Sequence, residues 1–146
     1  MVFITLLLDA IKGAIPVILA KLFVTSLSSI GLAPVLASIA VIIGHSKSCF
    51  LDFKGGKSVA SGVGTILALN LYVGIIIAII WGTITYATKY VSVGSIIALL
   101  LSPFLMYFFK SPIAYVCYCA LGAIYIVYLH RENIKRLIAG NENKVR

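Results

Sequence analysis

The sequence predicts a polytopic, all-α membrane protein with about six apolar helical segments, one of them short. Hydrophobic residues make up 62% of the 146 residues and charged residues only 11%, whereas soluble domains contain about 45–50% apolar residues. The mean hydropathy is +1.13. The apolar residues form long runs with basic residues between and after them. We therefore expect a single membrane domain over residues 1–146, with a helical bundle over 1–129 and a basic tail over 130–146.

The first apolar run covers residues 2–23 and is interrupted by Asp9, Lys12 and Lys21. A secretory signal has basic residues before its apolar core and a small-residue cleavage site after it, so we expect this run to be a retained span. Asp9 and Lys12 are three residues apart and share a helix face. Charges at that depth form a structural ion pair or serve function.

Further apolar segments follow the first. A short polar loop at residues 25–29 precedes a second span over 30–44. From residue 59 the chain is apolar again, and small residues at 60, 61, 62 and 64 precede an apolar stretch over 66–71 that Asn70 interrupts. This pattern predicts a short, closely packed helix with a turn near Asn70, and half-length helices of this kind line sites in membrane proteins. The remaining spans are expected over residues 72–88, 91–109 and 113–129, with Pro103 as a candidate kink.

A polar, glycine-rich island over residues 44–62 interrupts the apolar chain. Gly55 and Gly56 allow backbone N–H groups to converge on an anion, and Lys54 and Lys57 flank them with positive charge. Because a helix follows, the loop also lies at a helix N-terminus, which favours negative charge. The island is therefore predicted to bind phosphate and to be the reactive centre.

The basic residues of the tail orient the chain. They are Arg131, Lys135, Arg136, Lys144 and Arg146, and the positive-inside rule places such a segment in the cytoplasm. Counting back through four apolar segments returns the chain to the same side, so the phosphate-binding loop is expected there too. Two further crossings place the N-terminus on that side. All the polar clusters are therefore expected at one membrane face.

The tail itself predicts an amphipathic helix that lies along the membrane interface, because Ile134, Leu137 and Ile138 fall on one helix face. His130 and Asn133 share another face close to the membrane. A plain basic anchor is the alternative interpretation of this segment.

The other polar residues predict neither a metal site nor a nucleic-acid site. Cys49, Cys117 and Cys119 are odd in number and two lie in an apolar run, so no disulfide framework, zinc site or other metal or cofactor is expected. His45, taken alone, is more often a structural residue than a base. The formal charge of +8 is placed to meet anionic headgroups or substrates rather than nucleic acid.

Three segments carry motifs in a fixed order along the chain. They are Asp9-x-x-Lys12-Gly13; Gly44-His45 with Phe50, Phe53-Lys54-Gly55-Gly56-Lys57 and Val59-Ala60; and His130-Arg131-x-Asn133-Ile134-x-Arg136-Leu137-x-x-Gly140-x-Glu142. Together they resemble the recurrent segments of the bacterial acyl-phosphate:glycerol-3-phosphate acyltransferases of the PlsY type, which are small multi-span membrane enzymes. The resemblance covers essentially the whole chain, and three ordered matches are far more specific than any one of them.

The resemblance implies transfer of a fatty acyl group from acyl phosphate to the 1-hydroxyl of sn-glycerol 3-phosphate. The product is lysophosphatidic acid, a phospholipid precursor made at the bacterial cytoplasmic (inner) membrane, and both ends of this chain are expected in the cytoplasm. Acyl phosphate has a good leaving group, so a positioned hydroxyl can attack it without a covalent acyl-enzyme. The expected partners are glycerol 3-phosphate, acyl phosphate and the lipid bilayer, without nucleic acid.

The same resemblance assigns roles to individual residues. The catalytic residues are expected to be His130, Asn133 and Lys57, with His130 preferred over His45 as proton acceptor and Asn133 orienting substrate or donating to the oxyanion. Phosphate binding is assigned to Lys54, Gly55, Gly56, Lys57, Ser58, His45, Arg131 and Arg136. Supporting roles are assigned to Asp9, Lys12, Gly13 and Glu142.

The chain departs from the family pattern in two places. The family begins with an additional span and a first signature rich in serine, asparagine and glycine, and this sequence starts after that point. Within the island, Ser48 and Ser58 stand where proline and glycine are usual, and Ser61 replaces a threonine but keeps a hydroxyl. Ser58 adds a Cβ to a loop that is expected to approach phosphate closely.

The sequence also offers alternatives to this function. A soluble-type glycerophosphate acyltransferase needs His-x-x-x-x-Asp, but Phe50 stands five residues after His45. A nucleotide-binding P-loop needs glycine at Leu51, five residues before Gly56. A small transporter for an anionic solute also has glycine-broken helices, although here the charges gather at one face. An inactive or truncated copy of the acyltransferase is the other alternative.

Overall fold

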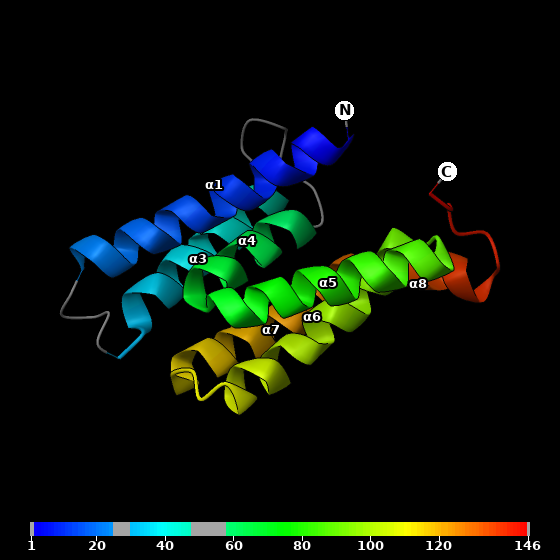
Figure 1. Cartoon of the computed structure of the whole chain (residues 1–146). Coiled ribbons are helices and arrows are strands. Elements are labelled where there is room, and N and C mark those ends of the chain that lie inside the picture. Colours follow the sequence, from blue (N-terminus) through cyan, green and yellow to red (C-terminus); the bar gives the residue numbers. More distant parts are fainter. Residues whose placement is uncertain (1, 25–29, 48–57, 146) are drawn as a thin grey trace.

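The chain is described by a computed structural model over residues 2–24, 30–47 and 58–145, and within those residues the regular structure is entirely α-helical (Figure 1). The helices are α1 (Val2–Phe23), α3 (Leu32–Ser46), α4 (Val59–Leu69), α5 (Leu71–Thr88), α6 (Val91–Phe108), α7 (Ile113–Leu129) and α8 (Arg131–Ile138). The predicted all-α class and the six apolar segments are confirmed. The loop expected at residues 25–29 lies outside the described residues.

Among the described residues, the helices have about the predicted lengths, but several fall short of a full membrane span. Among the described residues, α5 and α6 are long and apolar enough to cross a membrane, and α7 with α8 adds a third span if this pair, bent by 57°, counts as one. Helix α3 has 15 residues and α7 has 17, whereas a membrane-crossing helix needs about 20. Helix α1 has 22 residues and contains the predicted charges.

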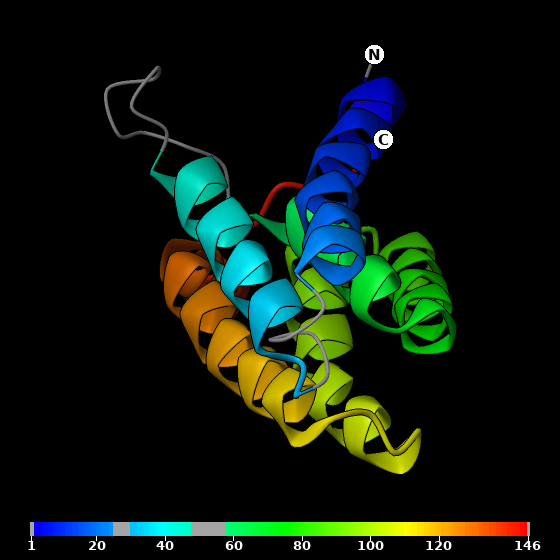
Figure 2. The same cartoon turned by 90° about the vertical axis from the view of Figure 1, so that its left-hand side faces the viewer.

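Helix α4 lies between α1 and α5 in the middle of the bundle (Figures 1 and 2). Its small residues allow this position. A Cβ atom added to Gly64 would collide with the carbonyl oxygen of Ala10, and one added to Gly13 would collide with the carbonyl oxygen of Ser61. Close backbone approach through small residues is the usual way in which membrane helices pack. The short helix predicted from the sequence is thus the one that its neighbours surround.

The break between α4 and α5 is held by polar side chains. Lys21 Nζ donates to the carbonyl oxygens of Ala68 at 2.6 Å and Leu69 at 2.9 Å, which satisfies acceptors left unpaired at a helix C-terminus. Asn70 Oδ1 accepts the N–H of Val73 at 3.2 Å and so caps α5. Asn70 Nδ2 also donates to Ser111 Oγ at 2.9 Å, beyond the end of α6. The predicted turn near Asn70 is confirmed.

The opposite end of the bundle gathers segments from the whole chain. The N-terminal end of α1, the turn between α5 and α6, and helix α8 lie at that end, as do both termini of the chain (Figure 1). The backbone N–H of Val145 donates to the carbonyl oxygen of Lys89 at 2.8 Å, which ties the C-terminal tail to the turn between α5 and α6. Among the described residues, the start of α1 and the basic tail, both predicted at one face, therefore belong to one end of the molecule.

Candidate active site

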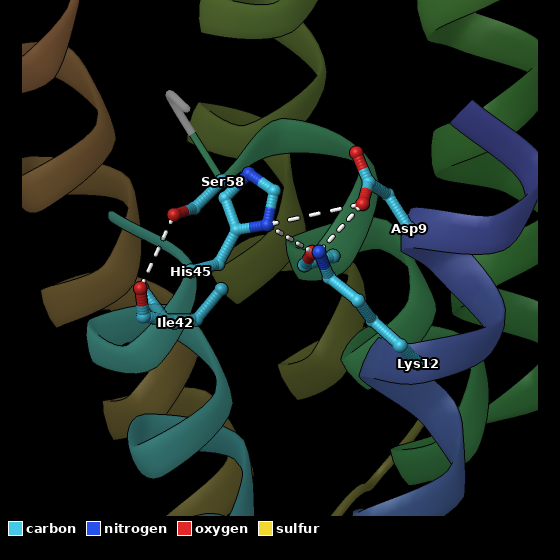
Figure 3. Close-up of polar contacts among 6 residues, drawn as sticks. Asp9, Lys12, Ile42, His45 and Ser58 are labelled. Carbon is cyan, nitrogen blue, oxygen red and sulfur yellow. Dashed lines mark hydrogen bonds and ion pairs between the residues drawn. The ribbon is translucent and has the colours of Figure 1, made fainter. Parts of the chain in front are cut away.

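A charged cluster joins α1, α3 and α4 (Figure 3). Lys12 Nζ lies 2.6 Å from Asp9 Oδ1, and His45 Nδ1 lies 3.9 Å from the same oxygen. His45 Nδ1 is also 3.2 Å from Ser61 Oγ in the first turn of α4. Asp9 and Lys12 thus form an ion pair, which is compatible with either the structural or the functional role expected for them. The cluster also holds His45 against the start of α4.

Ser58 precedes α4 in a left-handed conformation, with φ of 58°. Residues with a Cβ rarely adopt this backbone conformation, whereas glycine adopts it readily, which explains why glycine is usual here in the family that the chain resembles. The Ser58 hydroxyl donates to the carbonyl oxygen of Ile42 at 3.2 Å (Figure 3), and the residue is 1% exposed. Its side chain therefore faces α3, so any phosphate contact would come from its backbone.

A second cluster forms where the tail folds back onto α6 and α8. Glu142 Oε1 accepts hydrogen bonds from Ser92 Oγ at 2.9 Å and Asn133 Nδ2 at 2.5 Å. Arg136 Nε donates to Glu142 Oε2 at 2.7 Å. Burial alone would raise the pKa of Glu142, but these donors outweigh it and hold the pKa below the usual value for a glutamate. The carboxylate is therefore the charged centre that orders the tail.

His130 links α7 to α8 and is 2% exposed. Its Nδ1 lies 2.8 Å from the carbonyl oxygen of Ile126. A carbonyl oxygen only accepts hydrogen bonds, so Nδ1 carries the proton and, in the neutral ring, the lone pair is at Nε2. This tautomer is the one needed for a base that uses Nε2.

A cleft of about 480 Å³ brings the tail cluster next to α4. His130, Asn133, Arg136 and Glu142 line it together with Val59, the first residue of α4. Lys57 is two residues before Val59 in the chain, and Val59 lines this cleft. The first turn of α4 thus touches both polar clusters, with Val59 at the cleft and Ser61 at His45.

The described site residues fall into two groups, with Arg131 apart from both. The cleft brings together His130, Asn133, Arg136 and Glu142, while Asp9, Lys12, Gly13, His45 and Ser58 lie around α4. Arg131 is not among the residues that line the cleft: its guanidinium lies 4.5 Å from the centre of the Tyr128 ring. Lys54, Gly55, Gly56 and Lys57 lie outside the described residues, as does Cys49.

The sequence interpretation missed two serines of α6. Ser92 and Ser95 line the cleft, and Ser92 donates to Glu142. Their spacing of three residues at the start of an apolar run places both on one helix face, which was the only available signal. Among the described residues, no group of three or more His, Cys, Asp and Glu side chains could hold a metal ion.

Matches to known proteins cover nearly the whole chain. A family model described as glycerol-3-phosphate acyltransferase matches residues 1–140. Curated glycerol-3-phosphate acyltransferases from Gloeobacter violaceus and Thermotoga petrophila are 38% and 41% identical to this chain, covering 96% and 97% of it. They are covered over 68% and 70% of their own lengths. The chain therefore spans about two thirds of the length of such relatives.

Solved structures of one protein are also similar to this one. They are two crystal structures of PlsY (YgiH), an integral membrane glycerol 3-phosphate acyltransferase, in its glycerol 3-phosphate form and its lysophosphatidic acid form. The TM-scores are 0.91 and 0.90, with 29% sequence identity in both cases. Each match covers 99% of this chain and 70% or 72% of the other chain.

Proposed function

Because this chain belongs to the glycerol-3-phosphate acyltransferase family, we propose that it transfers a fatty acyl group from acyl phosphate to the 1-hydroxyl of glycerol 3-phosphate. The main structural support for this proposal is the cleft, which is lined by His130, Asn133 and the start of α4. The related PlsY has been crystallised in glycerol 3-phosphate and lysophosphatidic acid forms, which are the acceptor and product of the proposed reaction.

In the proposed reaction, the 1-hydroxyl oxygen attacks the carbonyl carbon of the acyl phosphate. The bond from that carbon to the bridging oxygen breaks, and the electron pair leaves with inorganic phosphate. The hydroxyl proton passes to Nε2 of His130, whose ring is held by the Ile126 carbonyl. The protein's main contribution is to hold the two substrates in contact, because the donor is already activated.

Asn133 is the proposed partner of His130. It lies three residues further along, on the same face of α8 and in the same cleft. Its amide nitrogen donates to Glu142, so the carboxylate fixes which way round the amide group lies. Asn133 is thus positioned to orient the glycerol moiety, and Glu142 acts through it.

We assign binding of the substrate phosphate groups to the positively charged residues that precede α4 and to Arg136. Lys54, Gly55, Gly56 and Lys57 directly precede Ser58, and α4 presents its N-terminal end to the same place. Arg136 adds a guanidinium to the cleft. His45 is partly buried next to the Asp9–Lys12 pair, so we assign it to positioning α4 rather than to proton transfer.

The same proposal includes the location of the protein. The chain acts as a single membrane domain of a bacterial cytoplasmic membrane, with both termini and the cleft on the cytoplasmic side. The support is that the basic tail and the N-terminus lie at one end of the bundle (Figure 1) and that basic segments remain on the cytoplasmic side.

The donor is tested with the purified chain in lipid, glycerol 3-phosphate, and either palmitoyl phosphate or palmitoyl-CoA. We expect lysophosphatidic acid and an equal amount of inorganic phosphate from palmitoyl phosphate, and no product from palmitoyl-CoA. Product from palmitoyl-CoA alone would overturn the donor assignment. A folded chain that forms no product from either donor would favour the inactive copy over the enzyme.

A further inference from the structure

An apolar groove of about 370 Å³ lies between α3 and α7, two helices that run side by side in Figure 2. Ile39 and Ile43 of α3 and Leu121 of α7 line the groove and are exposed. Ile42 and Tyr118 also line it but are buried. The groove therefore has a buried base and an open outer side, and in a bundle that crosses a membrane the open side meets hydrocarbon.

Gly122 of α7 keeps this groove open. It lines the groove, and a Cβ atom added to it would meet no neighbouring atom within 4 Å. By contrast, Gly13 and Gly64 are packed against the backbone of another helix. Glycine lowers the stability of a helix relative to alanine, and no packing contact among the described residues requires it at position 122. Its missing side chain instead leaves space for another molecule.

One end of the groove is polar. Lys47, the first residue after α3, lines the groove and is exposed. Tyr125 lines it as well, and its hydroxyl oxygen is 2.8 Å from Ser46 Oγ, which joins α7 to the last residue of α3. Among the described residues that line the groove, Lys47 alone is charged. A single positive charge thus stands at the end of an otherwise apolar channel.

These features define the chemistry of a matching ligand. From Ile39 to Lys47 the groove follows eight residues of α3, which is about 12 Å at 1.5 Å per residue. Lysine at the end of a membrane helix reaches the level of the lipid headgroups and attracts anionic ones, and tyrosine is common at the same level. A free phosphate ion would leave the apolar part empty. A hydrocarbon chain with a negatively charged head fits both parts.

We propose that the groove between α3 and α7 binds one anionic phospholipid of the surrounding bilayer. Its phosphate lies at Lys47 and Tyr125, and one of its acyl chains lies along Ile43 and Leu121, over Gly122. This lipid is a bound partner and not a substrate, because none of the described residues of the groove lines the polar cleft. The inference does not rest on the proposed acyltransferase activity.

The position of the groove gives the bound lipid a consequence for the site. Helix α3 carries His45, and α7 ends at His130. Ile42 lines the groove, and its carbonyl oxygen accepts the hydrogen bond of Ser58 at the start of α4. A lipid in the groove therefore joins the helix that positions α4 to the helix that leads into the cleft. Because it binds only the folded chain, it should raise the melting temperature.

The test measures lipid binding without any substrate. The probes are dioleoyl phosphatidylglycerol, which is anionic, and dioleoyl phosphatidylcholine, which is zwitterionic and has the same chains. The purified chain in detergent is mixed with equal amounts of both, and native mass spectrometry measures the complexes that contain one lipid. We expect about fivefold more phosphatidylglycerol than phosphatidylcholine, the preference that one lysine near a membrane surface supplies.

Two pairs of variants locate the binding site. Gly122→Phe places a ring in the groove and should lose the one-lipid complex. Gly82→Phe is its control, since a Cβ atom there also meets no atom within 4 Å but the residue belongs to α5, and it should bind lipid like the parent. Lys47→Ala should bind both lipids equally, whereas Lys47→Arg should keep the preference. Lys89→Ala removes one charge at the end of the bundle that holds the tail (Figure 1) and should also keep it.

Equal binding of the two lipids by the parent, or a preference that survives in Lys47→Ala, would overturn the assignment of the headgroup. Undiminished lipid binding by Gly122→Phe would overturn the assignment of the groove. A dimer of the parent chain that Gly122→Phe dissociates would show that a second copy fills the groove, which would also overturn the proposal. If Gly122→Phe does not fold, the exposed Lys47 variants decide the outcome. None of these results depends on turnover, so an inactive chain would leave the lipid site standing.

Discussion

Glu142 shows how one side chain organises the site. Its carboxylate takes hydrogen bonds from Ser92, Asn133 and Arg136, and only 6% of its side chain is exposed. The donors come from α6 and α8, so the carboxylate joins two helices as well as orienting Asn133. Removing the charge would leave three polar groups facing a weaker acceptor.

Glu142→Gln should therefore lower the free energy of unfolding by about 2 kcal/mol, the scale of a hydrogen bond to a charged group. Thermal unfolding in detergent measures this change. The substitution should also lower turnover, because Asn133 loses its fixed orientation. A variant as stable and as active as the parent would show that the carboxylate neither stabilises the fold nor orients Asn133.

The same carboxylate predicts a dependence of stability on pH. The folded-state pKa of Glu142 lies below its usual value, which is about 4.3 in an unfolded chain. Its contribution to stability is therefore complete above that pH and is lost as the pH falls through the lowered folded-state pKa. The difference in melting temperature between the parent and Glu142→Gln should shrink on acidification. A difference that grows in acid would contradict the stated direction of the pKa shift.

His130 is the residue on which the proposed proton transfer depends. His130→Ala removes the Nε2 base but leaves the phosphate-binding charges in place. We expect kcat to fall about 10²–10⁴-fold, which is the usual contribution of a general base, while KM for glycerol 3-phosphate changes much less. Steady-state kinetics with palmitoyl phosphate measure both constants. Unchanged kcat would exclude His130 as the base.

At the scale of the helix, α4 depends on backbone contacts that only glycine permits. Gly64→Ala places a Cβ against the carbonyl of Ala10, and such overpacking costs about 1–3 kcal/mol. Gly82→Ala is the matched control, since a Cβ there meets no atom within 4 Å and alanine favours a helix. We expect a lower melting temperature for the first variant and an equal or higher one for the second. Equal destabilisation by both would contradict the packing of α1 against α4.

The helices were largely predictable from the sequence, because membrane helices appear in a sequence as long apolar segments. The predicted runs 2–23 and 113–129 coincide with α1 and α7, and the small residues before Asn70 predicted α4. The start of α3 was predicted two residues early, because the helix begins only after Gly31, which has a φ of 77°. Such a backbone conformation leaves no mark in hydropathy.

The site was predictable only in part. The tail motif predicted His130 and Asn133 because residues three apart share a helix face. Ser92 shares the Glu142 carboxylate with Asn133 but lies 41 residues before it in the chain, and no local pattern links the two.

At the scale of the whole molecule, the fold gathers one end of nearly every helix around the start of α4 (Figure 1). One side of that helix faces the charged cluster of Asp9 and His45, and its first residue borders the polar cleft. The charged cluster and the polar cleft thus meet at the first turn of that helix. This arrangement suits an enzyme that joins a water-soluble phosphate to a lipid chain.

The most direct test of the account is the rate of lysophosphatidic acid formation by Lys57→Ala, compared with Lys89→Ala. Lys57 supplies the proposed phosphate-binding charge and precedes Val59, which lines the cleft, by two residues. Lys89 lies over the Tyr86 ring at 4.3 Å, and its contact with the tail uses only its backbone carbonyl, which alanine retains. We expect Lys57→Ala to lose at least about 10²-fold in turnover, the scale of a lost charge-stabilising group, and Lys89→Ala to match the parent. Equal losses in both variants, or full activity in Lys57→Ala, would contradict the assignment of the cleft as the site of acyl transfer.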